Sequence, residues 1–159
     1  MIKPEVAVYN NDKNEIEFID LENSIFVSKK IIIPVEARTK KNSQQLITIK
    51  TKYGKNRTIP IPSKQYLEFE KACKPYLENI DLAKKGALNL DCVFYMKTKR
   101  KVDLPNLLNS ICDVLVHHKV ISDDNSKIVY SFDGSCVRYD KLEPRVVINI
   151  SWYERALVK

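Results

Sequence analysis

The chain has 159 residues, a length that suits one domain with a single hydrophobic core and is short for two. Apolar residues make up 44% of the chain and the formal net charge is +7, which argues against a disordered tail. The sequence lacks both the run of about 18 apolar residues that a spanning helix needs and a signal-peptide pattern, so we expect a cytoplasmic protein with no membrane partner.

The first 28 residues are acidic, with six Asp or Glu against two Lys. Apolar residues alternate weakly around the turn-like sequence NNDKN at residues 10–14, which predicts a short hairpin. We therefore assign residues 1–28 to an acidic N-terminal extension and residues 29–159 to the main domain. The isoleucines of residues 31–33 predict a buried strand, because β-branched residues favour a pleated, covered surface.

Residues 36–45 are polar and predict a loop. A second strand starts at Leu46, and a turn over residues 53–56 follows it. Apolar residues then recur at steps of three and four, which predicts a helix over residues 63–78. Ser63 is placed to cap this helix, because its hydroxyl can accept a hydrogen bond from a first-turn amide.

Apolar side chains occupy the even positions of residues 88–97, and this period of two predicts a strand. From Leu104 the spacing changes to i, i+3, i+4 and i+7, which predicts an amphipathic helix that runs into His117. Two more strands are predicted over residues 128–132 and 145–152. The predicted order is β-β-α-β-α-β-β, a small single α/β (α+β) domain with a mixed β-sheet and two main helices.

Four cysteines stand about 20 residues apart, with no Cys-x-x-Cys pair and no histidine at metal-ligand spacing. This spacing argues against a zinc module. We expect all four to be small apolar core residues, namely Cys73, Cys92, Cys112 and Cys136.

Positive charge is concentrated in residues 29–57, which hold nine Lys or Arg and a single acid, Glu36. A second basic run, KTKRK at residues 97–101, lies just ahead of Asp103. Basic surfaces attract polyphosphates because each bound phosphate releases condensed counterions. Charge therefore favours nucleic acid as the partner, although the same lysines would equally solvate a loop and a hairpin.

Polar residues share one edge of the predicted second helix. At about 100° per residue, Asn106, Ser110 and Asp113 lie on the same side as Asp103, opposite the leucines. Beyond the helix, two adjacent aspartates at residues 123–124 lie in a turn that could return to the first end of the helix or stay near its last.

Carboxylates beside a basic surface repel phosphate unless a cation stands between them. Mg²⁺ binds through one or two carboxylates, completes its shell with water and phosphate oxygens, and can activate a water for in-line attack. Each residue also has a plain structural explanation. Asp103 fits a helix N-cap and the Asp-Asp pair fits a turn, while Asn106 and Asp113 fit the solvated face of a helix.

Three segments together resemble the RusA-type Holliday-junction resolvases. They are KRKVDLPNLL at residues 99–108, ICDVL at 111–115 and VISDD at 120–124. The family pattern is a basic run, Asp-x-Asp-Asn-Leu-x-Lys opening a helix, Asp-x-Leu a turn or two later, and an Asp-Asp pair. The resemblance covers about residues 97–150, with weaker likeness in TKKNSQ and PSKQY near the first predicted helix.

The resemblance implies a RusA-like nuclease domain over residues 29–159. Such a domain would be a homodimeric, Mg²⁺-dependent endonuclease, with Mn²⁺ as a possible substitute, that cuts four-way (Holliday) DNA junctions in recombination and repair. Phages and prophages often encode these enzymes, and their partner is branched DNA. By position, Asp103 and Asn106 match the first motif, and Asp124 matches the second member of the Asp-Asp pair; Asp113 and Asp123 also match.

Two residues depart from the family pattern. Pro105 stands in place of the second motif aspartate, and Asn109 in place of the helix lysine. A proline is tolerated in a first helical turn, which has no amide partner to lose, but the change removes a metal ligand. Either Asp113 or Asp123 takes up the missing coordination, or the protein cleaves less and mainly binds DNA.

The favoured interpretation is a structure-selective endonuclease. Asp103 and Asp124 would hold Mg²⁺, Asp123 and Asp113 would add coordination or orient water, and Asn106 would position a ligand or phosphate. The residues expected to bind DNA are Lys40, Lys41, Lys97, Lys99, Arg100 and Lys101. A two-fold dimer matches the two symmetric cuts that a four-way junction needs. The alternative is a non-catalytic nucleic-acid-binding module with the same fold.

Overall fold

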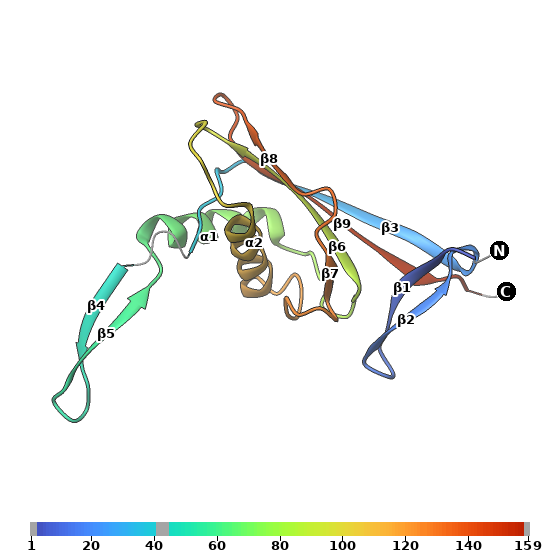
Figure 1. Ribbon diagram of the computed structural model, residues 1–159, viewed down its shortest axis with the longest axis horizontal. Coiled ribbons are helices and arrows are strands. Elements are labelled where there is room, and N and C mark those ends of the chain that lie inside the picture. The colour runs from blue at the N-terminus through green and yellow to red at the C-terminus, as the bar shows by residue number, and fades with distance from the viewer. Residues whose placement is uncertain (1–2, 41–44, 158–159) are drawn as a thin grey trace.

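Strands dominate the architecture. The computed structural model describes residues 3–40 and 45–157, and this part of the chain holds nine strands, one short 3-10 turn and two α-helices (Figure 1). The strands are β1 (Glu5–Asn10), β2 (Glu15–Asp20), β3 (Ser24–Ile33), β4 (Gln45–Lys50), β5 (Asn56–Ile61), β6 (Leu88–Met96), β7 (Val129–Ser131), β8 (Cys136–Tyr139) and β9 (Arg145–Arg155). The helices are α1 (Lys64–Leu77) and α2 (Leu104–His117). Neither helix in the described ranges is long and apolar enough to cross a membrane.

One mixed sheet forms the centre of the fold. Its strands follow the order β3-β9-β6-β7, and β8 also pairs with β6. The β3–β9 and β9–β6 pairs are antiparallel, whereas β7 and β8 run parallel to β6. Alternate residues of β6 and β9 are buried and pack with the apolar sides of both helices in one core. Both helices cover the same face of the sheet (Figure 1), so the predicted α+β class is confirmed.

Both helices form where the apolar spacing predicts them. α1 begins after Ser63, whose hydroxyl accepts a hydrogen bond from the backbone N–H of Tyr66 (3.1 Å). In α2, the side chains of Leu107, Ile111 and Leu115 are buried in the core. Their burial fixes the rotation of α2 about its axis and so decides where its polar edge lies.

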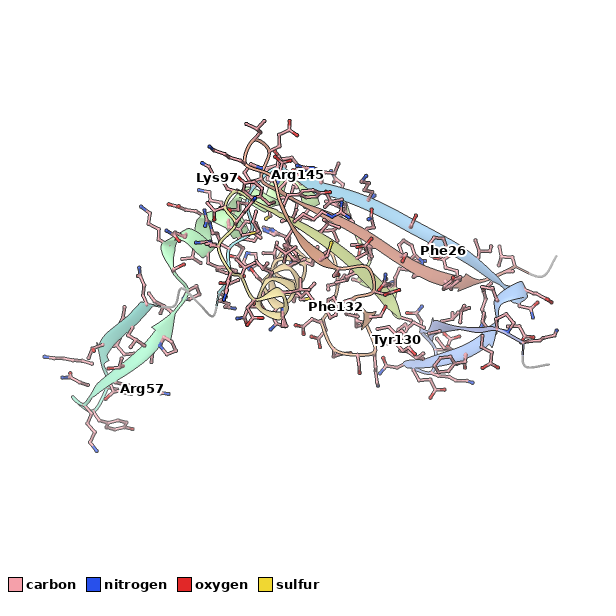
Figure 2. All side chains as sticks on the ribbon, turned by 45° about the horizontal axis from the view of Figure 1, so that its top comes forward. Phe26, Arg57, Lys97, Tyr130, Phe132 and Arg145 are labelled. Atoms are coloured by element: carbon pink, nitrogen blue, oxygen red, sulfur yellow. The ribbon has the colours of Figure 1, made fainter. Side chains whose placement is uncertain are left out.

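Two hairpins lie outside the main sheet. β1 and β2 form the predicted N-terminal hairpin, and β4 pairs with β5 in a second one. Figure 2 shows Arg57, on β5, well away from Lys97 and Arg145. The β4–β5 hairpin therefore projects from the body of the protein.

The strand predicted over residues 31–33 is longer than expected and is not wholly buried. β3 begins at Ser24, within the segment that we assign to the N-terminal extension. Ile31 and Ile33 are buried, but Ile32 is 49% exposed. β3 is an edge strand covered on one face, so successive side chains point alternately into the core and into solvent.

Two strands, β5 and β8, are absent from the predicted elements. Most of their residues are exposed, so neither has the hydrophobic alternation on which strand prediction depends. The same exposure explains the one cysteine that differs from expectation. Cys73, Cys92 and Cys112 are buried as predicted, whereas Cys136, at the start of β8, is only partly buried.

Gly134 lies in the turn between β7 and β8 with a φ of 91°, and a Cβ there would stand 2.9 Å from Cγ of Asp91. We expect Gly134→Ala to lower the free energy of unfolding by about 1–3 kcal/mol, because it adds positive-φ strain and crowds Asp91. Urea unfolding measures this cost. Gly54→Ala is the control, since Gly54 also has a positive φ (73°) but open space at its Cβ position. Equal costs for the two variants would show that Asp91 does not restrict the turn.

Candidate active site

The polar edge of α2 faces a basic segment of the chain. Asn106 Nδ2 donates a hydrogen bond to Asp103 Oδ2 (2.9 Å), one turn along the helix. The Ser110 hydroxyl, which is buried, donates to the backbone carbonyl of Arg38. Asp113 Oδ2 lies 3.3 Å from Lys40 Nζ. Residues 38–40 therefore run along the same edge that the helical period predicts.

Asp103 occupies the N-cap position of α2, but its carboxylate makes no capping hydrogen bond. The side chain is exposed, and it accepts the hydrogen bond from Asn106. It also lines a cavity of about 510 Å³ together with Arg38, Arg100 and Lys101. Helix capping therefore does not explain why an aspartate stands at this position. Its carboxylate instead lies beside three cationic residues.

Both carboxylate oxygens of Asp123 accept hydrogen bonds within its own turn. Its Oδ1 accepts a hydrogen bond from the backbone N–H of Asp124 (2.7 Å), and its Oδ2 accepts one from Asn125 Nδ2 (2.7 Å). These hydrogen bonds, chiefly that from Asn125, lower the pKa of the Asp123 carboxyl. Asp123 therefore shapes the turn, while the adjacent Asp124 side chain is exposed.

The Asp123–Asp124 turn stays near the last turns of α2. Burial raises the pKa of the Cys112 thiol to about 12, with further contributions from the negative charges of Asp124 and then Asp113. The backbone N–H groups of Val120 and Ile121 both donate to the carbonyl of Leu115 (2.9 and 3.5 Å), which turns the chain back at the end of α2 shortly before Asp123. Asp103 precedes Cys112 by nine positions, which corresponds to about 13 Å along the helix axis.

The predicted site residues thus form two groups within the chain. Asp103 and Asn106 lie at the start of α2, and Asp113 and Asp124 lie toward its end. Within residues 3–40 and 45–157, no three His, Cys, Asp or Glu side chains stand close enough together to hold a metal ion. Carboxylate oxygens are nevertheless the ligands that Mg²⁺ prefers, and one or two of them suffice when water and phosphate complete the shell.

The expected DNA-binding residues lie near both groups, with Arg100 and Lys101 beside Asp103 and Lys40 beside Asp113. Lys97, Lys99, Arg100 and Lys101 are all exposed in the segment between β6 and α2. Lys99 Nζ lies 5.2 Å from the centre of the Tyr139 ring, and Lys40 Nζ lies 5.8 Å from that of Tyr66. Lys41 falls outside the described residues.

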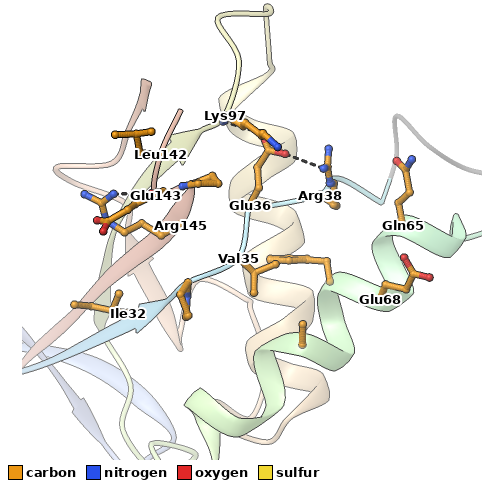
Figure 3. Close-up of a pocket in the computed structure, with 14 residues that line it drawn as sticks. Ile32, Val35, Glu36, Arg38, Gln65, Glu68, Lys97, Leu142, Glu143 and Arg145 are labelled. Atoms are coloured by element: carbon orange, nitrogen blue, oxygen red, sulfur yellow. Dashed lines mark hydrogen bonds and ion pairs between the residues drawn. The ribbon is translucent and has the colours of Figure 1, made fainter. Parts of the chain in front are cut away.

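A second cavity of about 1020 Å³ adjoins this basic segment (Figure 3). It is lined by Lys97, Glu36 and Arg38, and by residues of α1 and of the loop before β9. Glu36 Oε1 accepts a hydrogen bond from the backbone N–H of Lys97 (2.8 Å), and Glu36 Oε2 forms an ion pair with Arg38 (2.7 Å). Glu36 therefore ties residues 36–38 to the start of the basic run.

Two features of the site are not predicted by the sequence. Arg38 and Gln65 line both the 510 Å³ and the 1020 Å³ cavity. Arg38 lies in the basic stretch and Gln65 follows the predicted helix start, but local periodicity cannot show that they meet α2. The second feature is the N-terminal hairpin, whose Asn14 carbonyl accepts a hydrogen bond from Lys127 Nζ (3.2 Å) just beyond the Asp123–Asp124 turn.

Comparison with known proteins places this site in a family. A search of the curated proteins finds no significant match to the chain. The family model described as Endodeoxyribonuclease RusA matches residues 46–151. This match covers α2, the preceding basic run and the Asp123–Asp124 turn, along with most of the central sheet. The chain therefore belongs to the RusA endodeoxyribonuclease family, whose members are hydrolases that act on DNA.

Proposed function

We propose that this protein is a Mg²⁺-dependent, structure-selective endonuclease that cuts four-way (Holliday) DNA junctions in recombination and repair. The RusA family match supports junction resolution as the activity. The observation that carries the proposal is the position of Asp103, an exposed carboxylate that shares a cavity with Arg38, Arg100 and Lys101. An anionic group among cations suits a site where a divalent ion and a DNA phosphate meet.

Asp103 and Asp124 are the proposed principal metal-binding residues, and Asp113 and Asp123 the supporting ones. When bound, Mg²⁺ (or Mn²⁺) would lower the pKa of a water nucleophile and neutralise charge on the leaving oxygen. Asn106 would hold the Asp103 carboxylate in place through the hydrogen bond that it donates. The basic run at residues 97–101 and Lys40 would bind the phosphates that flank the cut.

A second copy of the chain would complete each site. Asp103 precedes α2 and Asp124 follows it, and the helix between them has 14 residues, which corresponds to a length of about 21 Å. A two-fold arrangement of two protomers could bring the start of one α2 toward the end of the other. The same symmetry would set two equivalent sites against the two strands that a junction resolvase cuts.

The direct test is cleavage of a synthetic four-way junction. We expect the purified protein to make paired, symmetric nicks in the junction when Mg²⁺ or Mn²⁺ is present, and to leave a linear duplex of the same sequence intact. Chelation of the metal should abolish nicking. Failure to nick the junction at any metal concentration would refute the catalytic proposal.

A non-catalytic DNA-binding module is the second candidate. Two observations favour it: Pro105 replaces a carboxylate of the family motif, and no cluster of three metal-binding side chains occurs in the described part of one protomer. A passive binder would hold DNA equally well with and without Mg²⁺. Its affinity would rise when Asp103 is neutralised, because a charge that repels phosphate is lost. Calorimetric titration with Mg²⁺ separates the two candidates.

A further inference from the structure

The β4–β5 hairpin carries an unbalanced positive charge. Residues 45–61 contain Lys50, Lys52, Lys55 and Arg57 and no Asp or Glu. All four cationic side chains are exposed, and none takes part in an ion pair within the described residues. In contrast, Lys40, Lys85 and Arg145 elsewhere in the protein each pair with a carboxylate. The hairpin charge is thus available to an external anion.

The hairpin also stands clear of the rest of the protein. It projects from the body in both views (Figures 1 and 2), and none of its residues belongs to the hydrophobic core. Leu46 is 73% exposed and Tyr53, at the tip, is 87% exposed. A two-stranded hairpin gains little stability from its own contacts in water. Its projection therefore suits binding to something outside the chain better than support of the fold.

The place where the hairpin joins the body lies next to the candidate active site. The chain enters it shortly after Lys40, which contacts Asp113, and leaves it just before Ser63, which caps α1. Each strand has six residues, so the hairpin extends about 20 Å from that point. A DNA arm bound by the basic run at residues 97–101 would thus be within reach of the hairpin tip.

The charges lie on both faces of the hairpin. Paired residues of the two strands share a face, so Ile49 and Arg57 lie on one side and Lys50 and Asn56 on the other. Lys52 lies in the turn between the strands. Hydrogen bonds of Thr51 with Lys55 and Gly54 hold this turn together. A flat anionic surface would meet only one of the two faces.

The walls of a DNA groove present phosphates to both faces of an inserted element. The major groove of B-DNA is about 12 Å wide and admits a two-stranded ribbon. We propose that the distal half of the β4–β5 hairpin enters the major groove of one duplex arm of the substrate. Lys50 and Arg57 contact phosphates on opposite walls, and Lys52 and Lys55 contact the backbone at the tip. This inference rests on the proposed action on branched DNA.

Charge removal at matched positions tests the proposal. The hairpin variant carries Lys50→Gln, Lys52→Gln and Lys55→Gln. The control carries Lys71→Gln, Lys74→Gln and Lys84→Gln, which are also exposed and remove the same charge. Binding to a four-way junction is measured without metal over a range of salt concentrations. We expect the hairpin variant to bind about tenfold more weakly. The slope of log binding constant against log salt concentration should also become less steep by about 2.7, because three phosphate contacts are lost. The control should match wild type in both.

Guanine N7 lies in the major groove, so its protection from methylation reports the position of the hairpin. The hairpin reaches ~20 Å and a base pair occupies about 3.4 Å of the duplex. We therefore expect protection of guanines in one arm, about six base pairs from the cut. The hairpin variant should lose this protection. Equal binding by the hairpin and control variants, or unchanged protection, would overturn the proposal. So would a change in oligomeric state of the hairpin variant, which would assign the hairpin to a protein contact.

Cleavage separates this inference from the proposed function. The control variant, whose three lysines lie outside the hairpin and the candidate active site, should cleave the junction like wild type, whereas cleavage by the hairpin variant at subsaturating protein should fall in proportion to its weaker binding. If wild-type protein binds through the hairpin but never cleaves, the nuclease proposal fails and the hairpin assignment stands. If wild type cleaves and both variants bind equally, the hairpin assignment fails alone.

Discussion

Replacement of either Asp103 or Asp124 by Asn is expected to reduce junction cleavage about a thousandfold, which corresponds to the loss of ~4 kcal/mol of transition-state stabilisation by a metal ligand. Junction binding without metal should be retained or strengthened, since a negative charge near phosphate is removed. Cleavage is measured under single-turnover conditions, and binding by a mobility shift. Asp12→Asn, on the exposed N-terminal turn, is the control for loss of one surface carboxylate.

Mixed dimers show whether the two aspartates serve one site across two protomers. A dimer of one Asp103→Asn chain and one Asp124→Asn chain would keep one intact pair if each site takes Asp103 from one protomer and Asp124 from the other. It would keep none if both come from the same protomer. We therefore expect co-purified mixed dimers, each chain carrying a different tag, to nick one strand of the junction. Each variant alone should nick neither.

Two results would contradict the shared site. Mixed dimers as inactive as the two single variants would place both aspartates of a site in one chain. Sedimentation of the wild-type protein as a monomer at assay concentrations would remove the second protomer altogether. If either Asn variant cleaves the junction at the wild-type rate, the replaced aspartate is not a metal ligand.

The elements that the sequence predicts well are those with one buried face. β6 has apolar residues at alternate positions because one side of it packs under the helices, and α2 has its apolar residues at helical spacing for the same reason. β8 lacks such a signal, since three of its four residues are exposed. Hydrophobic periodicity reflects burial, so the exposed strands β5 and β8 leave no such pattern, although the equally exposed β4 is predicted from its apolar β-branched residues.

The candidate site is predictable only as far as local geometry extends. The helical period places Asp103, Asn106 and Asp113 on one edge, and the hydrogen bonds and ion pair along that edge agree. Their basic partner Lys40 is 73 positions from Asp113, and nothing in the local pattern reports such a distant contact. The same limit leaves the direction of the Asp123–Asp124 turn open in the sequence, whereas the hydrogen bonds from the backbone N–H groups of Val120 and Ile121 to the Leu115 carbonyl keep the turn near the end of α2.

Pro105 stands where the resemblance described above expects an aspartate, and under the proposed mechanism we expect Pro105→Asp to improve catalysis. Pro105 is exposed in the first turn of α2, two positions after Asp103. An aspartate there adds a carboxylate beside the proposed metal site and lies favourably at the helix N-terminus. The Mg²⁺ concentration for half-maximal junction cleavage should fall about tenfold, by analogy with other changes to the surroundings of a metal site.

Pro105→Asn and Pro105→Ala separate the carboxylate from the loss of the ring. All three substitutions release the fixed φ of proline, which costs about 0.4–1 kcal/mol of stability, but only aspartate adds a charge that Mg²⁺ can bind. The half-maximal Mg²⁺ concentration of the Asn and Ala variants should therefore stay at the wild-type value. If the Asp and Asn variants behave alike, position 105 lies outside metal contact, and the coordination that the family motif assigns to it must come from Asp113 or Asp123. In that event the ion would sit toward the end of α2, near Asp113 and the Asp123–Asp124 turn, rather than at its start.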